Sequence, residues 1–145
     1  MRILVDADAC PVKTIIVRCA KAQGLSVIMF TDTSHIINDG YSTVITVDKA
    51  ADNVDFALMV ALKPNDCVVT QDYGLAAMAL GKGAFTLNQN GLIFTNENID
   101  ELLMQRHLSA KARRAKNRAK GPSKRTKEDD ARFEDAFVAI ISKQS

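Results

Sequence analysis

The feature that most constrains the fold is an alternation of short apolar runs with helix-forming segments across roughly the first ninety residues. The apolar runs are continuous, with no polar residue at every second position, which is typical of parallel strands covered on both faces. Parallel strands joined through helices place those helices on both sides of the sheet. We therefore predict an α/β fold, a Rossmann-like three-layer sandwich with a mainly parallel sheet. The predicted strands are residues 2–6, 25–30, 43–47, 67–70 and 84–87.

The segments between these runs carry apolar residues at helical spacing. One helix should begin near Pro11, because a proline in the first turn has no N–H to leave unpaired. Two more should span residues 51–62 and begin at Asp72. Asn90-Gly91 stands between two apolar runs and is typical of a two-residue hairpin turn. We therefore expect an antiparallel hairpin at one edge of the sheet.

The chain has 145 residues, a length that suits one hydrophobic core. Hydrophobic residues at 47% and charged residues at 25% are ordinary for globular proteins and argue against disorder. The apolar spacing stops after Leu108 and resumes near Phe133. We expect an α/β domain at residues 1–108. Residues 109–145 should form a basic linker and a C-terminal helix that packs on the same domain.

Two features bear on the location of the protein. No apolar run approaches the roughly 18 residues that span a bilayer, and the sequence enters a strand pattern at once, without a signal-peptide pattern. Cys10, Cys19 and Cys67 are odd in number and lack CxxC spacing, which argues against a disulfide framework and a zinc knuckle. We expect a cytoplasmic protein with reduced thiols and no membrane association.

Aspartates follow the predicted strands at the edge where α/β proteins bind ligands. Asp6 and Asp8 close the first strand two residues apart, so in extended geometry their side chains should point the same way. Asp48 closes the third strand and Asp72 follows the fourth. Asp52 and Asp55, one helical step apart at the start of the next helix, are able to face the same crevice.

Carboxylates gathered in a small volume repel one another unless a cation neutralises them. Because no His or Cys stands at ligand spacing, Mg²⁺ or Mn²⁺ is favoured over zinc, with Asp6, Asp8 and Asp72 as ligands. Such a site suits metal-assisted hydrolysis of a phosphodiester or phosphomonoester. The competing interpretation is that Asp48, Asp52 and Asp72 only start or cap helices. His35 and His107 are assigned no role.

Three further side chains near these acids have two interpretations each. Thr70 and Gln71, beside Asp72, are expected to contact a substrate phosphate, although threonine is also common in strands. Asn88 either completes the acidic crevice or belongs to the hairpin turn. Cys10 lies near a helix N-terminus, where the dipole favours a thiolate, but a packed, inert thiol is the preferred interpretation because no base is near in sequence.

The basic residues are concentrated in one segment. Residues 102–127 contain ten Lys or Arg and no acid, whereas residues 1–101 contain seven against twelve acids. Such a run favours a polyanionic partner, and since it contains no aromatic residue, contact should be with phosphates and not with bases. We expect Arg113, Arg114 and Arg118 to bind nucleic acid, most simply RNA. The alternatives are a solvated helix end and a clamp onto the acidic body.

Four stretches together carry a family resemblance. They are VDADACPVK at 5–13, the spacing of Asp48, Asp52 and Asp55, VTQDYGL at 69–75, and Arg113-Arg114 with Gly121-Pro122. In this combination the chain resembles, over nearly its whole length, the YaiI/YqxD family of uncharacterised bacterial proteins, which brings no established activity. Lys13, in the first stretch, is expected to contact substrate.

The fold implied by the resemblance is similar to that of PIN-type and NYN-type nuclease domains, which hold Mg²⁺ or Mn²⁺ with acids. By that likeness Asp6 and Asp8, Asp52 or Asp55, and Asp72 take the places of the catalytic acids. The sequence departs from the pattern at Asn88, which is neutral near the fourth acidic position of many such nucleases.

Three functions follow as hypotheses. The first is a divalent-metal-dependent ribonuclease, in which Asp52 or Asp55 orients the attacking water and the basic segment holds RNA. The second is a non-catalytic nucleic-acid or ribosome-associated module with a degenerate acid site. The third, a DxD phosphatase with an aspartyl nucleophile, is disfavoured because no later lysine-then-paired-aspartate pattern follows.

Overall fold

A computed structural model describes residues 1–115 and 124–142. In this part of the chain a six-stranded sheet has the order β3-β2-β1-β4-β5-β6, and all pairs are parallel except β5 with β6. The predicted α/β class with a mainly parallel sheet is confirmed. The strands are β1 (Ile3–Asp6), β2 (Val27–Asp32), β3 (Thr43–Val47), β4 (Cys67–Val69), β5 (Phe85–Leu87) and β6 (Ile93–Phe94).

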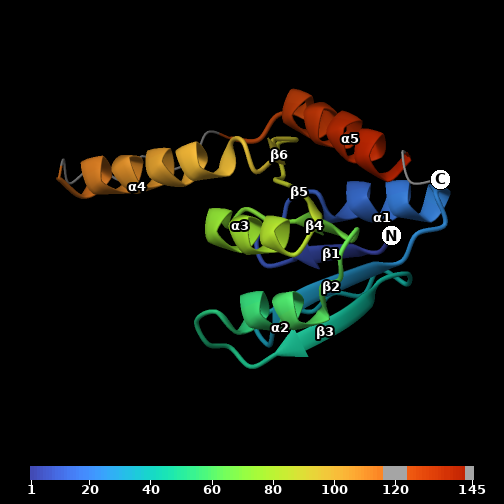
Figure 1. Ribbon diagram of the computed structural model, residues 1–145. Coiled ribbons are helices and arrows are strands. Elements are labelled where there is room, and N and C mark those ends of the chain that lie inside the picture. Colours follow the sequence, from blue (N-terminus) through green and yellow to red (C-terminus); the bar gives the residue numbers. More distant parts are fainter. Residues whose placement is uncertain (116–123, 143–145) are drawn as a thin grey trace.

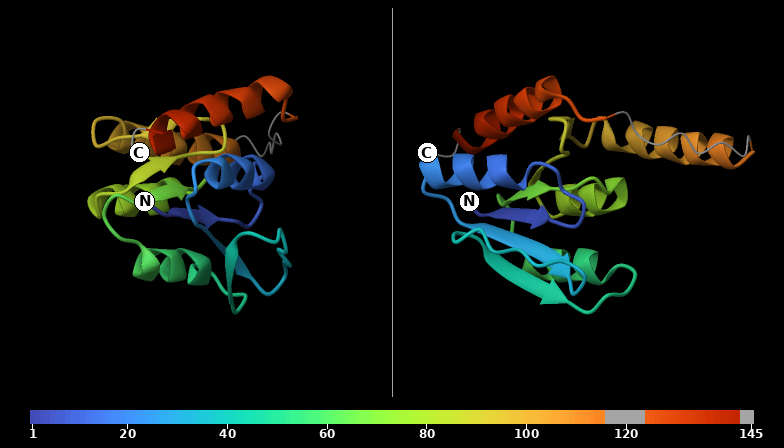
Figure 2. Two further views of the ribbon diagram at one scale, coloured as in Figure 1. Left: turned by 90° about the vertical axis from the view of Figure 1, so that its right-hand side faces the viewer. Right: turned by 180° about the vertical axis from the view of Figure 1, so that it is seen from behind.

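Helices cover both faces of the sheet, as Figures 1 and 2 show. The central strand β1 alternates between the faces, because successive strand side chains point to opposite sides. The helices are α1 (Lys13–Ala22), α2 (Asn53–Ala61), α3 (Tyr73–Gly81), α4 (Ile99–Ala115) and α5 (Lys127–Ser142). Ile3 and Val5 belong to a core beneath α1 and α5, whereas Leu4 belongs to a second core beneath α2 and α3.

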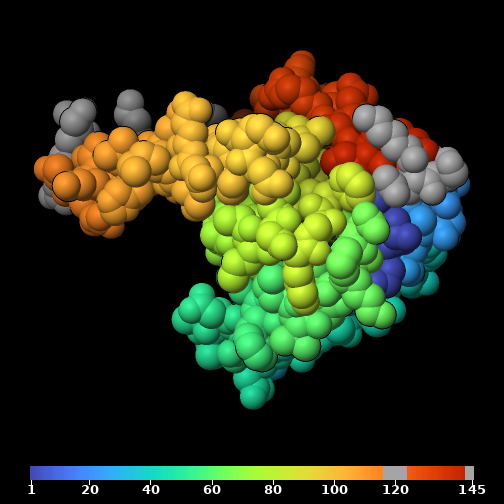
Figure 3. Space-filling view, in the orientation of Figure 1, coloured from blue at the N-terminus to red at the C-terminus, as the bar shows by residue number. Residues whose placement is uncertain are grey.

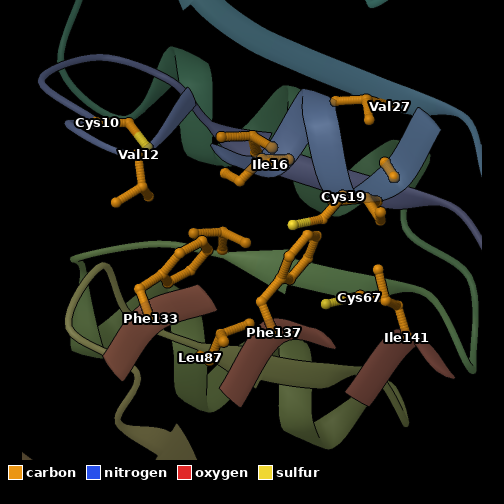
Figure 4. Close-up of a cluster of buried hydrophobic side chains, with 14 of the residues drawn as sticks. Cys10, Val12, Ile16, Cys19, Val27, Cys67, Leu87, Phe133, Phe137 and Ile141 are labelled. Carbon is orange, nitrogen blue, oxygen red and sulfur yellow. The ribbon is translucent and has the colours of Figure 1, made fainter. Parts of the chain in front are cut away.

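The C-terminal helix α5 packs against α1 over the first core. Phe133 and Phe137 are fully buried, stack with ring centroids 5.3 Å apart, and point toward Ile16 and Cys19 of α1 (Figure 4). At about 25 cal/mol per Å² of apolar surface, burying two phenylalanine side chains contributes several kcal/mol. An exposed ion pair between Arg18 and Glu134 lies at the rim of the same contact.

A close backbone approach joins the hairpin to α5. Gly91 has φ +84, and a Cβ built there would lie 2.5 Å from the carbonyl oxygen of Arg132. Arg125 adds three hydrogen bonds across this junction, to Asp130, Asn90 and the carbonyl of Gln89. Only glycine fits Gly91, since the position needs both a left-handed backbone and an absent side chain.

Several predicted bounds and turns differ from the structure. Residues 88–92 connect β5 to β6, so the hairpin loop is longer than the predicted two-residue turn. Asn88 is the reason, because its side-chain carbonyl accepts the backbone N–H groups of Asn90 and Leu92 and closes a wider loop. α1 begins at Lys13, two residues after Pro11, and β2 extends to Asp32, two residues beyond its predicted end.

Helix α4 extends beyond the rest of the chain. Its first turns pack against α3, and its second half projects away from the body in Figures 1 and 3. Lys111, Arg113 and Arg114 are all exposed on that half. None of the described helices is both long enough and apolar enough to cross a membrane.

Candidate functional site

The predicted aspartates meet at the carboxyl end of the parallel strands. A crevice of about 450 Å³ lies there between the β1 and β4 ends and helix α4. A second, more apolar pocket of about 440 Å³ adjoins it between α2 and α3 and shares Asp72 and Gly74 with it. The crevice is lined by Asp6, Asp8, Gln71, Asp72, Tyr73, Gly74, Leu103 and Arg106, and the second pocket adds Asp52 and Asp55.

Asp6 is the innermost acid of the group. It follows Leu4 on the β1 face that α2 and α3 cover, so its side chain shares that face with the acids of both helices. Thr70, buried at 1% exposure, donates its hydroxyl to Asp6 Oδ2 at 2.8 Å and accepts the backbone N–H of Asp72. Burial raises the pKa of Asp6, the Thr70 hydrogen bond lowers it, and the charges of Asp72 and Asp8 raise it further.

Asp55 and Asp72 are coupled across the boundary between the two pockets. The pKa of Asp55 is raised from 3.8 to about 6, first by burial, then by the charges of Asp72 and Asp6, and by a hydrogen bond to the Asp72 side chain. A hydrogen bond between two carboxyl groups requires a proton on one of them. Asp55, whose pKa is about 6, is therefore the member of the pair that carries this proton at lower pH.

Asp72 also caps α3, as the competing interpretation of the sequence held. Its Oδ1 accepts the backbone N–H of Leu75 at 3.0 Å. Capping and membership of the acidic group are compatible, because the residue is exposed and lines both pockets.

Asp52 occupies the N-cap position of α2 but does not cap it with its side chain. Its backbone is left-handed, with φ 66, which is uncommon for a residue with a Cβ. The exposed carboxylate lines the second pocket, and its charge contributes to the raised pKa of Asp55.

Asp8 lines the same crevice as Asp6, but the two carboxylates bond to opposite sides of β1, which corrects the expectation that they point the same way. The strand ends at Asp6, and Asp8 lies in the following turn. Its Oδ1 accepts the Thr31 hydroxyl at 2.5 Å, on the β2 side of β1, whereas Asp6 bonds to Thr70 on the β4 side. The extended geometry assumed from the sequence therefore stops too early to align them.

Two residues at and beyond the end of β2 join Asp8, and sequence reasoning missed both. His35 Nδ1 lies 3.0 Å from Asp8 Oδ1 and 3.4 Å from Asp32 Oδ1. Asp32 accepts the Ser34 backbone N–H at 2.8 Å and its hydroxyl, and the Ser34 hydrogen bonds hold the pKa of Asp32 below its usual value. Asp32 is itself a strand-end aspartate, so the signal existed in the sequence, but the predicted strand ended too early to show it. For His35 we find no local sequence signal.

The loop between β1 and α1 is fixed by residues predicted to contact substrate. Gln71 donates its side-chain N–H to the carbonyl of Ala9 at 2.8 Å, and Lys13 donates to the carbonyl of Ala7 at 3.3 Å. Together with Thr70, which bonds to Asp6, these side chains hold the acids in position. Their contact with a substrate stays a prediction.

Cys10, Asn88 and Asp48 line neither the crevice nor the second pocket. Cys10 is buried, and burial raises its thiol pKa more than the Val12 backbone N–H and the Lys13 charge lower it, which fits the packed, inert thiol. Asn88 is buried and its side-chain carbonyl is used in the hairpin, so the hairpin interpretation of Asn88 holds. Asp48 is exposed beyond β3, at the far edge of the sheet.

The basic segment is divided among three places. Arg106 lines the acidic crevice, with its guanidinium carbon 5.0 Å from the Tyr73 ring centroid. Arg113 and Arg114 are exposed on α4, and Arg118 lies outside the described residues. Arg125 joins the hairpin to α5. This one residue therefore has the structural role that the clamp alternative assigned to the whole segment.

A separate groove of about 780 Å³ runs along α1 beside the acids. Three cationic side chains of α1 line it, together with His35 and the exposed Ile36. Arg18 is paired with Glu134, and the Lys21 ammonium lies 5.7 Å from the Tyr41 ring centroid. The cationic residues of α1 are Lys13, Arg18 and Lys21.

Comparison with known proteins gives consistent matches over almost the whole chain. Residues 4–143 match a family model described as "Uncharacterized BCR, YaiI/YqxD family". A UPF0178 protein of Ruminiclostridium cellulolyticum is 60% identical over 145 residues, covering 100% of this chain and 95% of that protein. A UPF0178 protein of Clostridium acetobutylicum is 54% identical over 143 residues, covering 97% of each chain. One from Exiguobacterium sibiricum is 46% identical over 145 residues, covering 100% of this chain and 99% of that one. No solved structure was found to match.

Proposed function

The chain belongs to the uncharacterised YaiI/YqxD family, and we propose that it is a divalent-metal-dependent ribonuclease that hydrolyses RNA phosphodiesters at its aspartate crevice. The observation that carries the proposal is the coupling of Asp6, Asp55 and Asp72. Burial and their mutual repulsion together raise the pKa of Asp55 to about 6.

The donor set favours a hard cation. The three carboxylates come from β1, α2 and the start of α3, and in the described part of the crevice neither a thiolate nor an imidazole stands beside them. Carboxylate oxygens are the preferred ligands of Mg²⁺ and Mn²⁺. A cation bound there would favour the ionised form of Asp55 and would neutralise the charges that raise its pKa, which supports a metal site among these acids.

Each residue of the crevice has a role in this proposal. Asp6 and Asp72 hold the ion, and Asp8 lies on the far side of Asp6. Thr70 fixes the positions of the two ligands, because it donates to the Asp6 carboxylate and accepts the Asp72 backbone N–H. Asp55, or Asp52 beside it, orients the water that attacks phosphorus and accepts its proton. Bound Mg²⁺ or Mn²⁺ would supply electrostatic stabilisation of the pentacoordinate phosphorus and of the leaving oxygen. Arg106, which also lines the crevice, would pair with a phosphate oxygen of the substrate.

Cationic surfaces on two sides of the crevice support RNA as the substrate. Lys111, Arg113 and Arg114 are exposed on α4, and Lys13 and Lys21 line the groove along α1. Neither surface includes an exposed aromatic ring for base stacking among its described residues, so the contacts should be to phosphates. Substrate choice would then depend on charge and on access to the crevice.

The second candidate is a non-catalytic RNA-binding or ribosome-associated module. The projection of α4, with its exposed basic half away from the acids, favours this alternative, because such a helix is able to bind a polyanion without a reaction. In that case the acids would affect stability and not turnover.

The test is cleavage of a panel of single-stranded and structured RNA and DNA oligonucleotides with increasing Mn²⁺ or Mg²⁺. Wild type is compared with Asp6→Asn, and Asp48→Asn serves as the matched control because Asp48 is an exposed strand-end aspartate outside the crevice. We expect ion-dependent cleavage by wild type and by Asp48→Asn, and a loss of at least about 100-fold in Asp6→Asn. RNA binding without cleavage in all three proteins would favour the binding module.

A further inference from the structure

We infer that Asp8, Asp32 and His35 form a second cation site, which takes Mn²⁺ or Zn²⁺ in preference to Mg²⁺. The site goes beyond the proposed nuclease activity, because binding there requires no reaction and does not use Asp6, Asp55 or Asp72. It lies at the ends of β1 and β2, on the other side of Asp8 from the crevice acids.

The spacing of the three ligand atoms fits one ion. One donor atom from each of the three residues lies within 4.8 Å of the other two. His35 Nδ1 is 3.0 Å from Asp8 Oδ1 and 3.4 Å from Asp32 Oδ1. In a six-coordinate site with bonds of about 2.1 Å, neighbouring ligand atoms are about 3 Å apart, so the side chains would need to move little.

Each of the two carboxylates accepts a hydrogen bond from a neighbouring residue, as carboxylate ligands of metal ions commonly do. Thr31, which is fully buried, donates its hydroxyl to Asp8, and Ser34 donates its backbone N–H to Asp32. Such outer hydrogen bonds orient ligating groups and tune their affinity. The three residues come from the β1–α1 turn, the end of β2 and the loop after it, so the fold brings them together from separate segments.

The imidazole determines which ions are preferred. Nitrogen ligands favour Mn²⁺, and more strongly Zn²⁺, over Mg²⁺, which requires oxygen ligands and retains its water. The His35 side chain is 48% exposed, so an ion reaches it from solvent, and two carboxylates balance a divalent charge. A direct ion pair between protonated His35 and the two carboxylates would give the same distances, and the experiment must separate the two arrangements.

The chain offers a direct assay because His35 and His107 are its only histidines. Their ring nitrogen and carbon signals are followed by NMR while Zn²⁺, Mg²⁺ or substoichiometric Mn²⁺ is added at a pH of about 7.5, above the ordinary pKa of histidine. We expect Zn²⁺ to shift the His35 signals, Mn²⁺ to broaden them, and Mg²⁺ at the same concentration to leave them unchanged. His107, on the exposed part of α4, should respond to none of the three.

Calorimetric titration with Mn²⁺ separates this site from the nuclease centre. His35→Gln should lose one ion per chain, or bind it at least about tenfold more weakly, while His107→Gln keeps wild-type binding. Asp6→Asn should keep the His35 response, so failure of the crevice to bind an ion would leave this site unaffected. The inference is overturned if His35 signals do not respond to Zn²⁺ or Mn²⁺, or if His35→Gln binds as many ions as wild type with equal affinity. His35 would then be an ion-pair partner of the two carboxylates only.

Discussion

The coupling of Asp55 to its neighbours gives the sharpest prediction for stability. We consider Asp55→Asn, which has nearly the same shape, is always neutral, and is able to donate an N–H to Asp72 where the protonated acid donated its O–H. In the wild-type protein the pKa of Asp55 is raised from 3.8 to about 6. Between these two pH values the folded state therefore retains a proton that the unfolded chain releases. Wild-type stability must therefore fall as the pH rises through this window, and the whole penalty is present above a pH of about 6.

The magnitude follows from the size of the pKa change. Raising the pKa from 3.8 to about 6 corresponds to at most about 3 kcal/mol. Because the side chain is only partly buried, solvent screening reduces this value, and we expect about 1 kcal/mol. Ion-free Asp55→Asn should thus be about 1 kcal/mol more stable than wild type at a pH of about 8, with a melting temperature about 2–4 °C higher, and the difference should disappear near a pH of about 4.

The assay is urea unfolding followed by far-UV circular dichroism in EDTA, since the chain has no tryptophan. Asp48→Asn is the control and should stay within about 0.5 kcal/mol of wild type at both pH values. Adding Mn²⁺ should reverse the order at the higher pH, because wild type gains stability by mass action and the variant gains less. If Asp55→Asn is no more stable than wild type at the higher pH, or gains equally at both pH values, then Asp55 is not destabilised by its acidic neighbours.

Three further predictions follow from contacts outside that pair. Without added ions, Asp72→Asn should be at least as stable as wild type, because asparagine also caps helices. Asp72→Ala should lose about 1 kcal/mol in urea unfolding, and the difference between the two variants tests the cap on the Leu75 N–H. Gly91→Ala should lower the free energy of unfolding by about 2–4 kcal/mol, because the new Cβ would meet the Arg132 backbone. Gly40→Ala is the control, since Gly40 has φ +75 but no atom within 4 Å of the added Cβ, and it should lose about 1 kcal/mol. Equal losses would show that the close approach to α5 is unimportant. Replacing Arg113, Arg114 and Arg118 together by Gln should weaken the binding of all RNA sequences alike. The slope of log K against log salt should become shallower by about 0.7 for each phosphate that is no longer neutralised. An unchanged slope in a filter-binding assay would remove the main support for RNA binding.

The sequence predicts the sheet well because its signals are local. Continuous apolar runs indicate the five parallel strands in their order along the chain, and the Asn90-Gly91 region indicates the antiparallel edge. The errors arise where side chains from distant segments decide the geometry. Asn88 widens the hairpin through its own side-chain carbonyl, and β2 continues to Asp32 where it pairs with β3, which no local pattern indicates.

The candidate site is predictable only in part, for the same reason. The strand-end rule finds Asp6 and Asp72, and helical spacing finds Asp55, because each depends on one element. It does not find His35, whose place depends on the path of the loop after β2, nor Arg106, whose place depends on how α4 packs against α3. Residues that reach a site from a loop or a neighbouring helix leave little trace in the sequence.

The ion-free protein tolerates its crowded carboxylates by a different means at each one. Asp6 accepts the Thr70 hydroxyl, Asp8 accepts the Thr31 hydroxyl and faces His35, and Asp55 is able to keep a proton against Asp72. These partners are neutral donors or titratable groups, and among the described residues the only permanent cation lining the crevice is Arg106. A protein that needed the acids only for structure would gain by placing a fixed cation among them or by losing a carboxylate, since either change removes the repulsion. Crowded carboxylates that are each held by a partner which an ion is able to supplement or displace are therefore what the proposed cation binding requires.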